Sequence, residues 1–283
     1  MEIGNLFTFT GKELDMKKSI LITGASGTVA KASAKELKKY GHRVIGVSRS
    51  IEKDAEEYTE TEKVDLLESE DLKSLKELME EVDAVFHLAW NLKVENFDTG
   101  EKWPQNLEMF ENVIKAATQA NVAIFVNGSS IHAGTGDIPA YTVEASLEDT
   151  PEPYRGSIDP SKDFDLRKNA PEKLISPLRK KPDSPYGESK IKTEERLKEA
   201  VEEDKFRLGA SIRIGGVNSE DKTELEGEPY YSSLYWSHKD IGRTLKNIIN
   251  SDLEEVNGYH QFYGVSDNEG RIFNIENSFT TPK

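Results

Sequence analysis

Tyr186 and Lys190 stand four residues apart, in a stretch that begins with Ser184-Pro185 and continues with helix-forming sequence. Residues four apart on a helix lie on one face, so the phenol and the ammonium can point into the same site. An ammonium beside a phenol favours the phenolate and lowers its pKa, and such a tyrosine can take a proton from a hydroxyl near neutral pH. The same spacing also suits a surface turn followed by a solvated helix. The pair therefore needs partners elsewhere in the chain before it indicates a catalytic base.

A glycine-rich loop between a predicted strand and a predicted helix is the first such partner. The apolar run 19–23 predicts a buried parallel strand, and a helical pattern runs from the loop to Tyr40. Gly24 permits a tight turn, and Gly27 lets the backbone approach a pyrophosphate held on the free N–H groups of the helix. The loop thus predicts a dinucleotide site, with an empty βα turn as the lesser alternative. Its expected cofactor contacts are Gly24, Ser26, Gly27, Thr28 and Val29.

The end of the second predicted strand, 42–47, bears on which dinucleotide is bound. NAD usually meets an acidic residue at this place, whereas an arginine nearby can accept the 2′-phosphate of NADP. Ser48 stands in the acidic position and Arg49 follows, which favours NADP over NAD. A solvated Arg49 is the alternative, and the acidic segment 51–63 opposes an added phosphate. Asp65, near the end of a short predicted strand, is either an acceptor for the adenine amino group or a turn carboxylate.

A fourth predicted strand and its exit loop, 82–91, add apolar residues to the same region. In a doubly wound sheet, ligands lie at the carboxyl ends of the strands. Trp90 follows this strand on the side expected for the nicotinamide, although ordinary core packing is an alternative for it. The apolar residues expected to line the cofactor are Leu66, Leu88, Ala89, Trp90 and Ile214.

Two more strand ends carry polar side chains. Strand 122–127 leads into Ser130, which can hydrogen-bond the reacting oxygen, and His132, which can contact substrate, although a lone histidine is usually structural. Arg213 lies near the end of a buried strand, so it needs an anionic or carbonyl partner. The long irregular stretch 135–183 is rich in proline and basic residues and precedes Tyr186. Such a loop is usually functional or disordered, and recruitment of an anionic sugar competes with a solvated charged insertion.

Composition excludes several classes of protein. The 283 residues carry a formal net charge of −15, which argues against general binding to nucleic acid or an anionic membrane. No cysteine is present, which excludes disulfides, thiolate metal sites and a cysteine nucleophile. No apolar run is long enough to span a bilayer, and the absence of cysteine agrees with a cytoplasmic protein. We expect no metal site, no nucleic-acid partner and no membrane partner. Residues 1–16 are expected to be an extension, and 17–283 a single domain with a substrate-side portion at 214–283. The sequence leaves a homo-oligomer open.

Together the motifs resemble the extended short-chain dehydrogenase/reductases, the superfamily of NAD-dependent epimerases and dehydratases. The loop 24–30, Ser130, Tyr186 and Lys190 fall in that family's order, over roughly residues 17–275. Within the superfamily the chain looks most like uronate dehydrogenases and archaeal glucose-6-phosphate dehydrogenases, although the loop before Tyr186 is longer. That closer likeness rests on the stretches 87–91, 95–100, 129–133, 182–187, Arg213 with 215–218, 236–240 and 262–268.

The resemblance implies an α/β fold, a Rossmann-like doubly wound parallel sheet with a small C-terminal substrate-binding part. It also implies an NADP- or NAD-dependent oxidoreductase that oxidises the anomeric C1 of an aldose, sugar phosphate or uronate to a lactone. Tyr186 would take the proton of the C1 hydroxyl, and Ser130 would hold the reacting oxygen. Lys190 would lower the pKa of Tyr186 and bind the nicotinamide ribose. His132 and Arg213 would contact substrate, with Arg213 at a carboxylate or phosphate.

Two rival functions remain open from the sequence. A sugar-nucleotide 4-epimerase or dehydratase would use the same tyrosine and lysine with tightly held NAD, but such enzymes usually carry a larger C-terminal part than the stretch after Ile214. A non-catalytic regulatory protein that binds NAD(P) is the other rival. The presence of Ser130, Tyr186 and Lys190 argues against it.

Overall fold

The computed structural model describes residues 17–91, 103–136, 175–223, 231–268, 271 and 273–279. The expected extension 1–16 and most of the predicted loop 135–183 lie outside these residues. Within them, seven strands form one sheet in the order β3-β2-β1-β4-β5-β6-β7, and every neighbouring pair is parallel. The strands are β1 (Ser19–Thr23), β2 (Arg43–Val47), β3 (Glu60–Glu62), β4 (Ala84–His87), β5 (Ile124–Ser130), β6 (Leu208–Ile214) and β7 (Gly258–Gly264).

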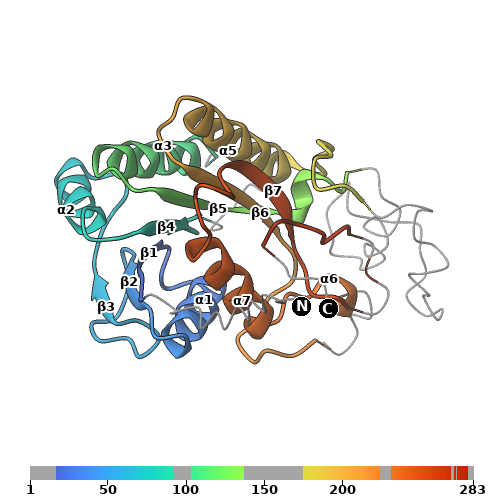
Figure 1. Cartoon of the computed structure of the whole chain (residues 1–283), viewed down its shortest axis with the longest axis horizontal. Helices are drawn as coiled ribbons and strands as arrows, with labels where there is room; N and C mark the ends of the chain where they lie inside the picture. The colour runs from blue at the N-terminus through green and yellow to red at the C-terminus, as the bar shows by residue number, and fades with distance from the viewer. Residues whose placement is uncertain are drawn as a thin grey trace, which may run out of the picture.

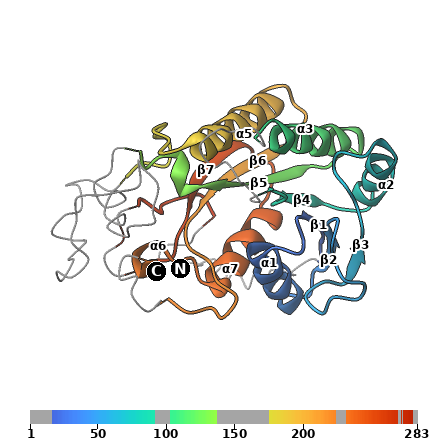
Figure 2. The ribbon, with the colours of Figure 1, turned by 180° about the vertical axis from the view of Figure 1, so that it is seen from behind.

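Helices cover both faces of the sheet (Figures 1 and 2). On one face, α1 and α7 pack against each other, and on the other face α2, α3 and α5 lie side by side. This arrangement confirms the expected Rossmann-like doubly wound α/β fold. The helices are α1 (Thr28–Lys39), α2 (Ser69–Met79), α3 (Trp103–Gln119), α5 (Pro185–Glu202), α6 (Tyr231–Leu234) and α7 (His238–Ile249), with a 3₁₀ turn η1 (Ile131–Ala133).

The core divides between the two faces because successive side chains of a strand point to opposite sides. In β1, Ile20 and Ile22 belong to the cluster beneath α1 and α7, whereas Leu21 belongs to the cluster beneath α2, α3 and α5. Both sides of the inner strands are therefore apolar, which is why these strands read as continuous hydrophobic runs rather than alternating ones.

The strand order reverses between β1 and β4, which are neighbours although β2 and β3 separate them in sequence. Such a reversal opens a crevice at the carboxyl ends of the strands, where this fold binds its ligands. Among the described residues, no helix is long and apolar enough to cross a bilayer.

Two predictions about elements are wrong. The third strand lies at Glu60–Glu62 rather than at 64–66; Val64 and Leu66 are buried all the same, as loop residues in the cluster beneath α2. The stretch 266–283, whose composition predicts a polar tail, instead buries Phe273 and Phe279. Phe273 forms a parallel bridge with Ile175, a contact between segments almost a hundred positions apart that no local pattern announces.

His87 is a titratable group inside the core. Its Nδ1 lies 2.9 Å from the Oγ1 of Thr23, and its ring packs edge-on against Phe110 with centroids 5.3 Å apart. Among the described residues, Nε2 has no hydrogen-bond partner. Burial, assisted by the charge of Lys190, lowers the pKa of His87 to about 3. The folded protein therefore holds this imidazole neutral.

We expect His87 to make the fold sensitive to acid. An unfolded histidine takes up its proton near pH 6.5, well above the folded pKa of about 3, so the stability that neutral His87 provides is complete above pH 6.5. Below that pH the contribution of His87 to the free energy of unfolding should fall by about 1.4 kcal/mol per pH unit. His87→Asn keeps an acceptor for Thr23 but cannot titrate. Urea unfolding of both proteins between about pH 4.5 and 7.5 should give the variant a shallower pH dependence, and equal slopes would contradict this role.

Candidate active site

Two adjoining cavities open at the carboxyl ends of the strands. The larger, about 740 Å³, is lined by the loop after β1, the ends of β4, β5 and β6, and the start of α5. The smaller, about 120 Å³, lies where an adenosine is expected in this fold. The larger cavity gathers these residues predicted from the sequence: Gly24, Ser26, Gly27, Thr28, Val29, Leu88, Trp90, Ser130, His132, Tyr186, Lys190 and Ile214. The smaller is lined by Gly24, Ser26, Arg49, Leu66, Ala89 and Trp90, among others.

The glycine loop has the shape that a dinucleotide needs. Gly24 has a φ of +69°, and a Cβ there would lie 2.7 Å from the backbone of Ala89. Gly27 precedes the first residue of α1 and offers no capping side chain, so the N–H groups of the first helical turn are available to an anion. The residues present therefore fit a pyrophosphate held at the start of α1, with the rest of the cofactor in the two cavities.

Helix α5 brings Tyr186 and Lys190 into the larger cavity. Ser184 caps the helix, its Oγ accepting the N–H of Gly187 at 3.2 Å, and Pro185 fits the first turn, where no intrahelical N–H is needed. A Cβ at Gly187 would lie 2.2 Å from the carbonyl oxygen of His132, so only glycine lets the helix start so close to η1. This contact places the phenol of Tyr186 beside the turn that follows Ser130.

Lys190 is buried beneath the cavity. Its Nζ donates to the carbonyl oxygen of Gly128 at 2.8 Å and lies 3.6 Å from the centroid of the Trp90 ring, a cation–π contact. Burial lowers the pKa of Lys190 to about 7, against the opposing charge of Glu194 one turn further along α5. Trp90 therefore does more than fill the core, because it forms one wall of the lysine's pocket.

Tyr186 meets Ser130 and His132 in the larger cavity. Ser130 hydrogen-bonds the phenol, and the ring centroids of Tyr186 and His132 are 5.6 Å apart. Burial raises the pKa of Tyr186 to about 12; the hydrogen bond from Ser130 opposes this and the charge of Asp183 adds to it. The expectation that Lys190 lowers this pKa is wrong for the arrangement described, because its ammonium faces Gly128 and Trp90, 5.6 Å from the centroid of the phenol ring.

Asp183 belongs to the site, a role that the sequence does not predict. Its Oδ2 lies 2.6 Å from the Nδ1 of His132 and accepts the hydroxyl of Thr135 at 2.8 Å. Its Oδ1 accepts the hydroxyl of Ser184 at 2.7 Å. Burial works to raise the pKa of Asp183, but the hydrogen bonds, led by that of His132, lower it overall. The only local signal was its place three residues before Tyr186.

The portion 214–283, expected on the substrate side, contributes lining residues that were not predicted individually. Gly215 and Gly216 follow β6, and with Tyr231 and Leu234 of α6 they line the same cavity as Tyr186. A Cβ on Gly216 would lie 2.6 Å from the Tyr231 ring, so this glycine leaves room for an aromatic side chain on the substrate side. The tyrosines around Tyr231 in the sequence form no period that would have singled out one of them.

Arg213 does not reach the cavity, which corrects the expectation that it contacts substrate. It lies on β6 with its side chain on the α5 face, and both it and Glu194 are essentially inaccessible to solvent. Its Nε and Nη2 donate to the two carboxylate oxygens of Glu194, each at 2.8 Å. The anionic partner that a buried arginine requires is thus a residue of the protein itself.

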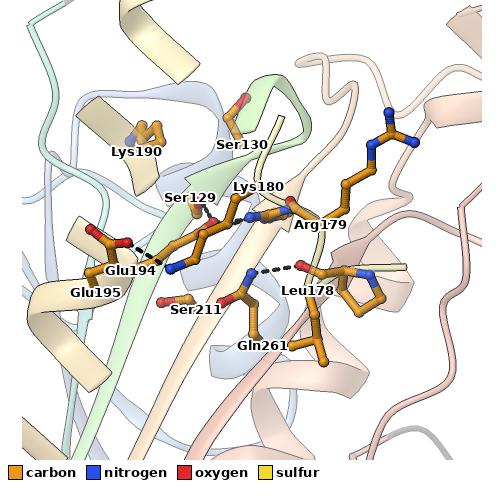
Figure 3. Close-up of polar contacts among 12 residues, drawn as sticks. Ser129, Ser130, Leu178, Arg179, Lys180, Lys190, Glu194, Glu195, Ser211 and Gln261 are labelled. Atoms are coloured by element: carbon orange, nitrogen blue, oxygen red, sulfur yellow. Dashed lines mark hydrogen bonds and ion pairs between the residues drawn. The ribbon is translucent and has the colours of Figure 1, made fainter. Parts of the chain in front are cut away.

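The Arg213–Glu194 pair joins the catalytic elements to a segment that we call the strap, residues 175–183. Nη1 of Arg213 donates to the carbonyl oxygen of Arg179 in the strap at 2.5 Å. Figure 3 shows the same cluster with Ser129, the neighbour of Ser130, donating to Glu194, and with Lys180 reaching Glu195. Arg213 therefore holds together α5, β5 and the strap, below the residues that line the cavity.

Asp65 serves a turn rather than lining the adenosine cavity. Its Oδ1 accepts the N–H of Leu67 at 3.1 Å, and its Oδ2 lies 3.8 Å from an Nη of Arg49. The Arg49 side chain is 61% exposed and stands beside hydroxyls of Ser26, Ser48 and Ser50, which are within hydrogen-bonding distance of one another. The turn role of Asp65, one of the two alternatives left by the sequence, is the one that the contacts support.

Solved structures share this architecture at low sequence identity. They include the uronate dehydrogenase from Agrobacterium tumefaciens (TM-score 0.62, 18% identity, covering 91% of this chain and 80% of that one) and the glucuronic acid dehydrogenase from Chromohalobacter salexigens (0.65, 19%, 92% and 81%). The UDP-N-acetylglucosamine 4-epimerase from Bacillus cereus is also similar (0.55, 20%, 89% and 79%). At these identities the likeness establishes the fold.

No curated protein matches the chain. Residues 20–215 match the model of the NAD dependent epimerase/dehydratase family, a span that holds the glycine loop, the serine, the tyrosine and the lysine of the site. The protein is accordingly a member of the NAD-dependent epimerase/dehydratase family, an NAD-dependent enzyme of the short-chain dehydrogenase/reductase type.

Proposed function

We propose that the protein oxidises the anomeric carbon of a sugar to a lactone, with an aldose, a uronate or a sugar phosphate as substrate. The observation that carries the proposal is the convergence of Ser130, Tyr186, Lys190 and His132 in one cavity with the glycine loop. Three of the similar structures are named as uronate or glucuronic acid dehydrogenases, which supports a reaction at C1 of a sugar acid or a close relative of one.

In the proposed reaction, Ser130 donates a hydrogen bond to the C1 oxygen and Tyr186 takes the proton of the C1 hydroxyl. The bound cofactor supplies the acceptor for the hydride that leaves C1, so the C1–O bond becomes a carbonyl and the two electrons leave the sugar. Lys190 lies beneath the cavity, in position to bind the nicotinamide ribose. Because burial raises the pKa of Tyr186 to about 12, the phenol can act as a base near neutral pH only when a positive charge close to its oxygen favours the phenolate.

Within this reaction class, glucose 6-phosphate is a specific candidate substrate, because two stretches of the chain resemble archaeal glucose-6-phosphate dehydrogenases. The proposal rests on the tryptophan-asparagine pair Trp90-Asn91 and the run 215–218. Trp90 stacks on Lys190 and lies edge-on to Tyr186, with ring centroids 6.0 Å apart. A tryptophan in this place shapes the nicotinamide pocket, which supports a functional rather than a packing role for the first of the two motifs.

The experiment is a panel of aldoses, uronates and sugar phosphates, each assayed with NAD and with NADP by the absorbance of the reduced nicotinamide. We expect at least one class to reduce the cofactor, and the product to be a lactone that hydrolyses to the acid, seen by NMR. A protein that purifies with NAD bound, reduces none of these sugars and interconverts nucleotide sugars would overturn the proposal. That result would establish instead the 4-epimerase or dehydratase chemistry that the family and one similar structure also include.

The preference for NADP or NAD should depend on Arg49. An arginine that binds the 2′-phosphate makes charge-assisted hydrogen bonds. Because the arginine is partly exposed to solvent, these bonds contribute less to the binding free energy. Arg49→Ala should therefore raise KM for NADP by about tenfold and leave KM for NAD within about twofold. Arg207→Ala, just before β6 where the arginine pairs with Glu254, is the matched control and should change neither value. Equal effects of Arg49→Ala on both cofactors would contradict the preference for NADP.

A further inference from the structure

The carboxylate of Asp183 controls one side chain of the cavity, His132. Asp183 is 13% exposed and His132 is 37% exposed, so the histidine reaches the cavity while its partner is mostly buried behind it. The two carboxylate oxygens receive donors from His132, Thr135 and Ser184, which leaves the carboxylate little freedom to turn. A histidine that meets such a partner has one ring orientation.

The backbone holds the same pair. The N–H of Asp183 donates to the carbonyl oxygen of His132 at 3.2 Å, and the N–H of Lys181 donates to the carbonyl oxygen of Ala133 at 3.1 Å. Backbone hydrogen bonds therefore join the strap to the turn η1 at the histidine and at the residue that follows it. Gly187 of α5 packs directly against the carbonyl oxygen of His132, because a Cβ at this position would lie only 2.2 Å from that oxygen.

The chemistry of the pair decides what the ring offers to a ligand. The pKa of Asp183 lies below its usual range because of its hydrogen bonds, so the carboxylate is ionised near neutral pH and can only accept. Nδ1 of His132 must then carry the hydrogen of their 2.6 Å contact. In a neutral ring this leaves Nε2 as an acceptor for a hydroxyl group.

We propose that Asp183 is a positioning residue that holds His132 in the tautomer whose Nδ1–H donates to the carboxylate. Nε2 of His132 then accepts a hydrogen bond from the sugar hydroxyl that neighbours the one deprotonated by Tyr186. His132 is then the residue that orients the sugar ring, and its edge-on contact with Tyr186 sets the distance between the two groups. This inference rests on the proposed function for its substrate, but the fixed state of the histidine is a property of the protein alone.

The first test therefore needs no turnover. Long-range ¹H–¹⁵N NMR of the full chain distinguishes the two neutral tautomers of each of its five histidines, and His132→Gln identifies the signals of His132. We expect the Nδ1–H tautomer in the wild-type protein and a shift towards the Nε2–H tautomer in Asp183→Asn, whose amide can donate to Nδ1. A wild-type ring with its proton on Nε2 would overturn the proposal, whether or not the protein oxidises sugars.

The second test is a double-mutant cycle on kcat/KM with the best substrate of the panel. Asp183→Asn should lower kcat/KM by about 10- to 100-fold, mostly through KM for the sugar, with the dissociation constant of the cofactor within about twofold. In a His132→Gln background the same change should have almost no further effect, because Asp183 acts through the histidine. Effects that multiply independently would show that Asp183 acts by another route and would overturn the proposal.

Asp240→Asn is the matched control, because Asp240 also accepts a serine hydroxyl, from Ser266 at 2.5 Å, but lies on α7 and does not line the larger cavity. It should leave both the tautomer and kcat/KM close to the wild-type values. If Asp183→Asn does not fold, the wild-type tautomer still decides the proposal. A wild-type protein that reduces no cofactor on any sugar would contradict the proposed function alone.

Discussion

Tyr186→Phe is expected to abolish nearly all sugar oxidation while leaving the cofactor bound. Removing the hydroxyl removes the group that takes the substrate proton, and general bases of this kind contribute about 10²- to 10⁴-fold to the rate. The ring itself stays, so its contacts with Trp90 and His132 and the shape of the cavity are kept. The measurement is kcat for the best substrate of the panel, with the dissociation constant of the cofactor from fluorescence titration.

Tyr259→Phe is the control for this experiment. Tyr259 lies on β7 and donates its hydroxyl to Gln261 at 2.9 Å, far from the residues that line the cavity. It should keep kcat within about twofold of wild type, because surface and remote hydrogen bonds contribute little to the transition state. Turnover that survives Tyr186→Phe with normal cofactor binding would show that the mechanism has a different base and would support a regulatory or another catalytic role.

Arg213→Met is expected to cost about 3–5 kcal/mol of the free energy of unfolding. The substitution leaves the carboxylate of Glu194 buried without its partner, and breaking a buried pair in this way is strongly destabilising. It also releases the carbonyl oxygen of Arg179, which loses its donor. The measurement is the urea midpoint at constant slope; a substrate-binding role for Arg213 would predict a change in KM with little change in stability.

Two further variants test whether the loss of stability comes from the buried ion pair. Adding Glu194→Gln to Arg213→Met removes the stranded charge and should restore part of the lost stability, since a neutral pair can be as stable as a buried ion pair. Lys73→Ala breaks the exposed pair with Glu70 and should change stability by less than about 0.5 kcal/mol. An Arg213→Met protein as stable as wild type would contradict the role of the cluster in holding the strap.

The sequence by itself determined the class of fold and most of the cavity. The glycine loop between strand and helix, the four-residue spacing of Tyr186 and Lys190, and the serine at a strand end are all local patterns. Parallel strands bring their carboxyl ends to one edge of the sheet, so residues that follow different strands meet without any further information. This is why the three predicted catalytic residues and most of the predicted cofactor contacts, Asp65 excepted, line the two adjoining cavities.

Only the tertiary structure decided which face and which partner each side chain has. Arg213 follows Ile212 and precedes Ile214, and the alternation of a strand fixes that it points away from them, but not which layer of helices it meets. The partners are far apart in sequence: Glu194 is 19 residues from Arg213, and Asp183 is 51 residues from His132. The segment 175–183, for which the sequence left both a functional loop and a solvated insertion open, forms the strap that supplies Asp183.

The protonation of the site was also beyond the sequence. The spacing of Tyr186 and Lys190 predicted a lowered tyrosine pKa, but that rule assumes that the ammonium faces the phenol. In the folded chain Lys190 turns to a carbonyl oxygen and the face of Trp90, and burial raises the pKa of Tyr186 instead. Residue type and spacing gave the groups that can move a proton; desolvation and orientation, which depend on packing between distant segments, decided their charge.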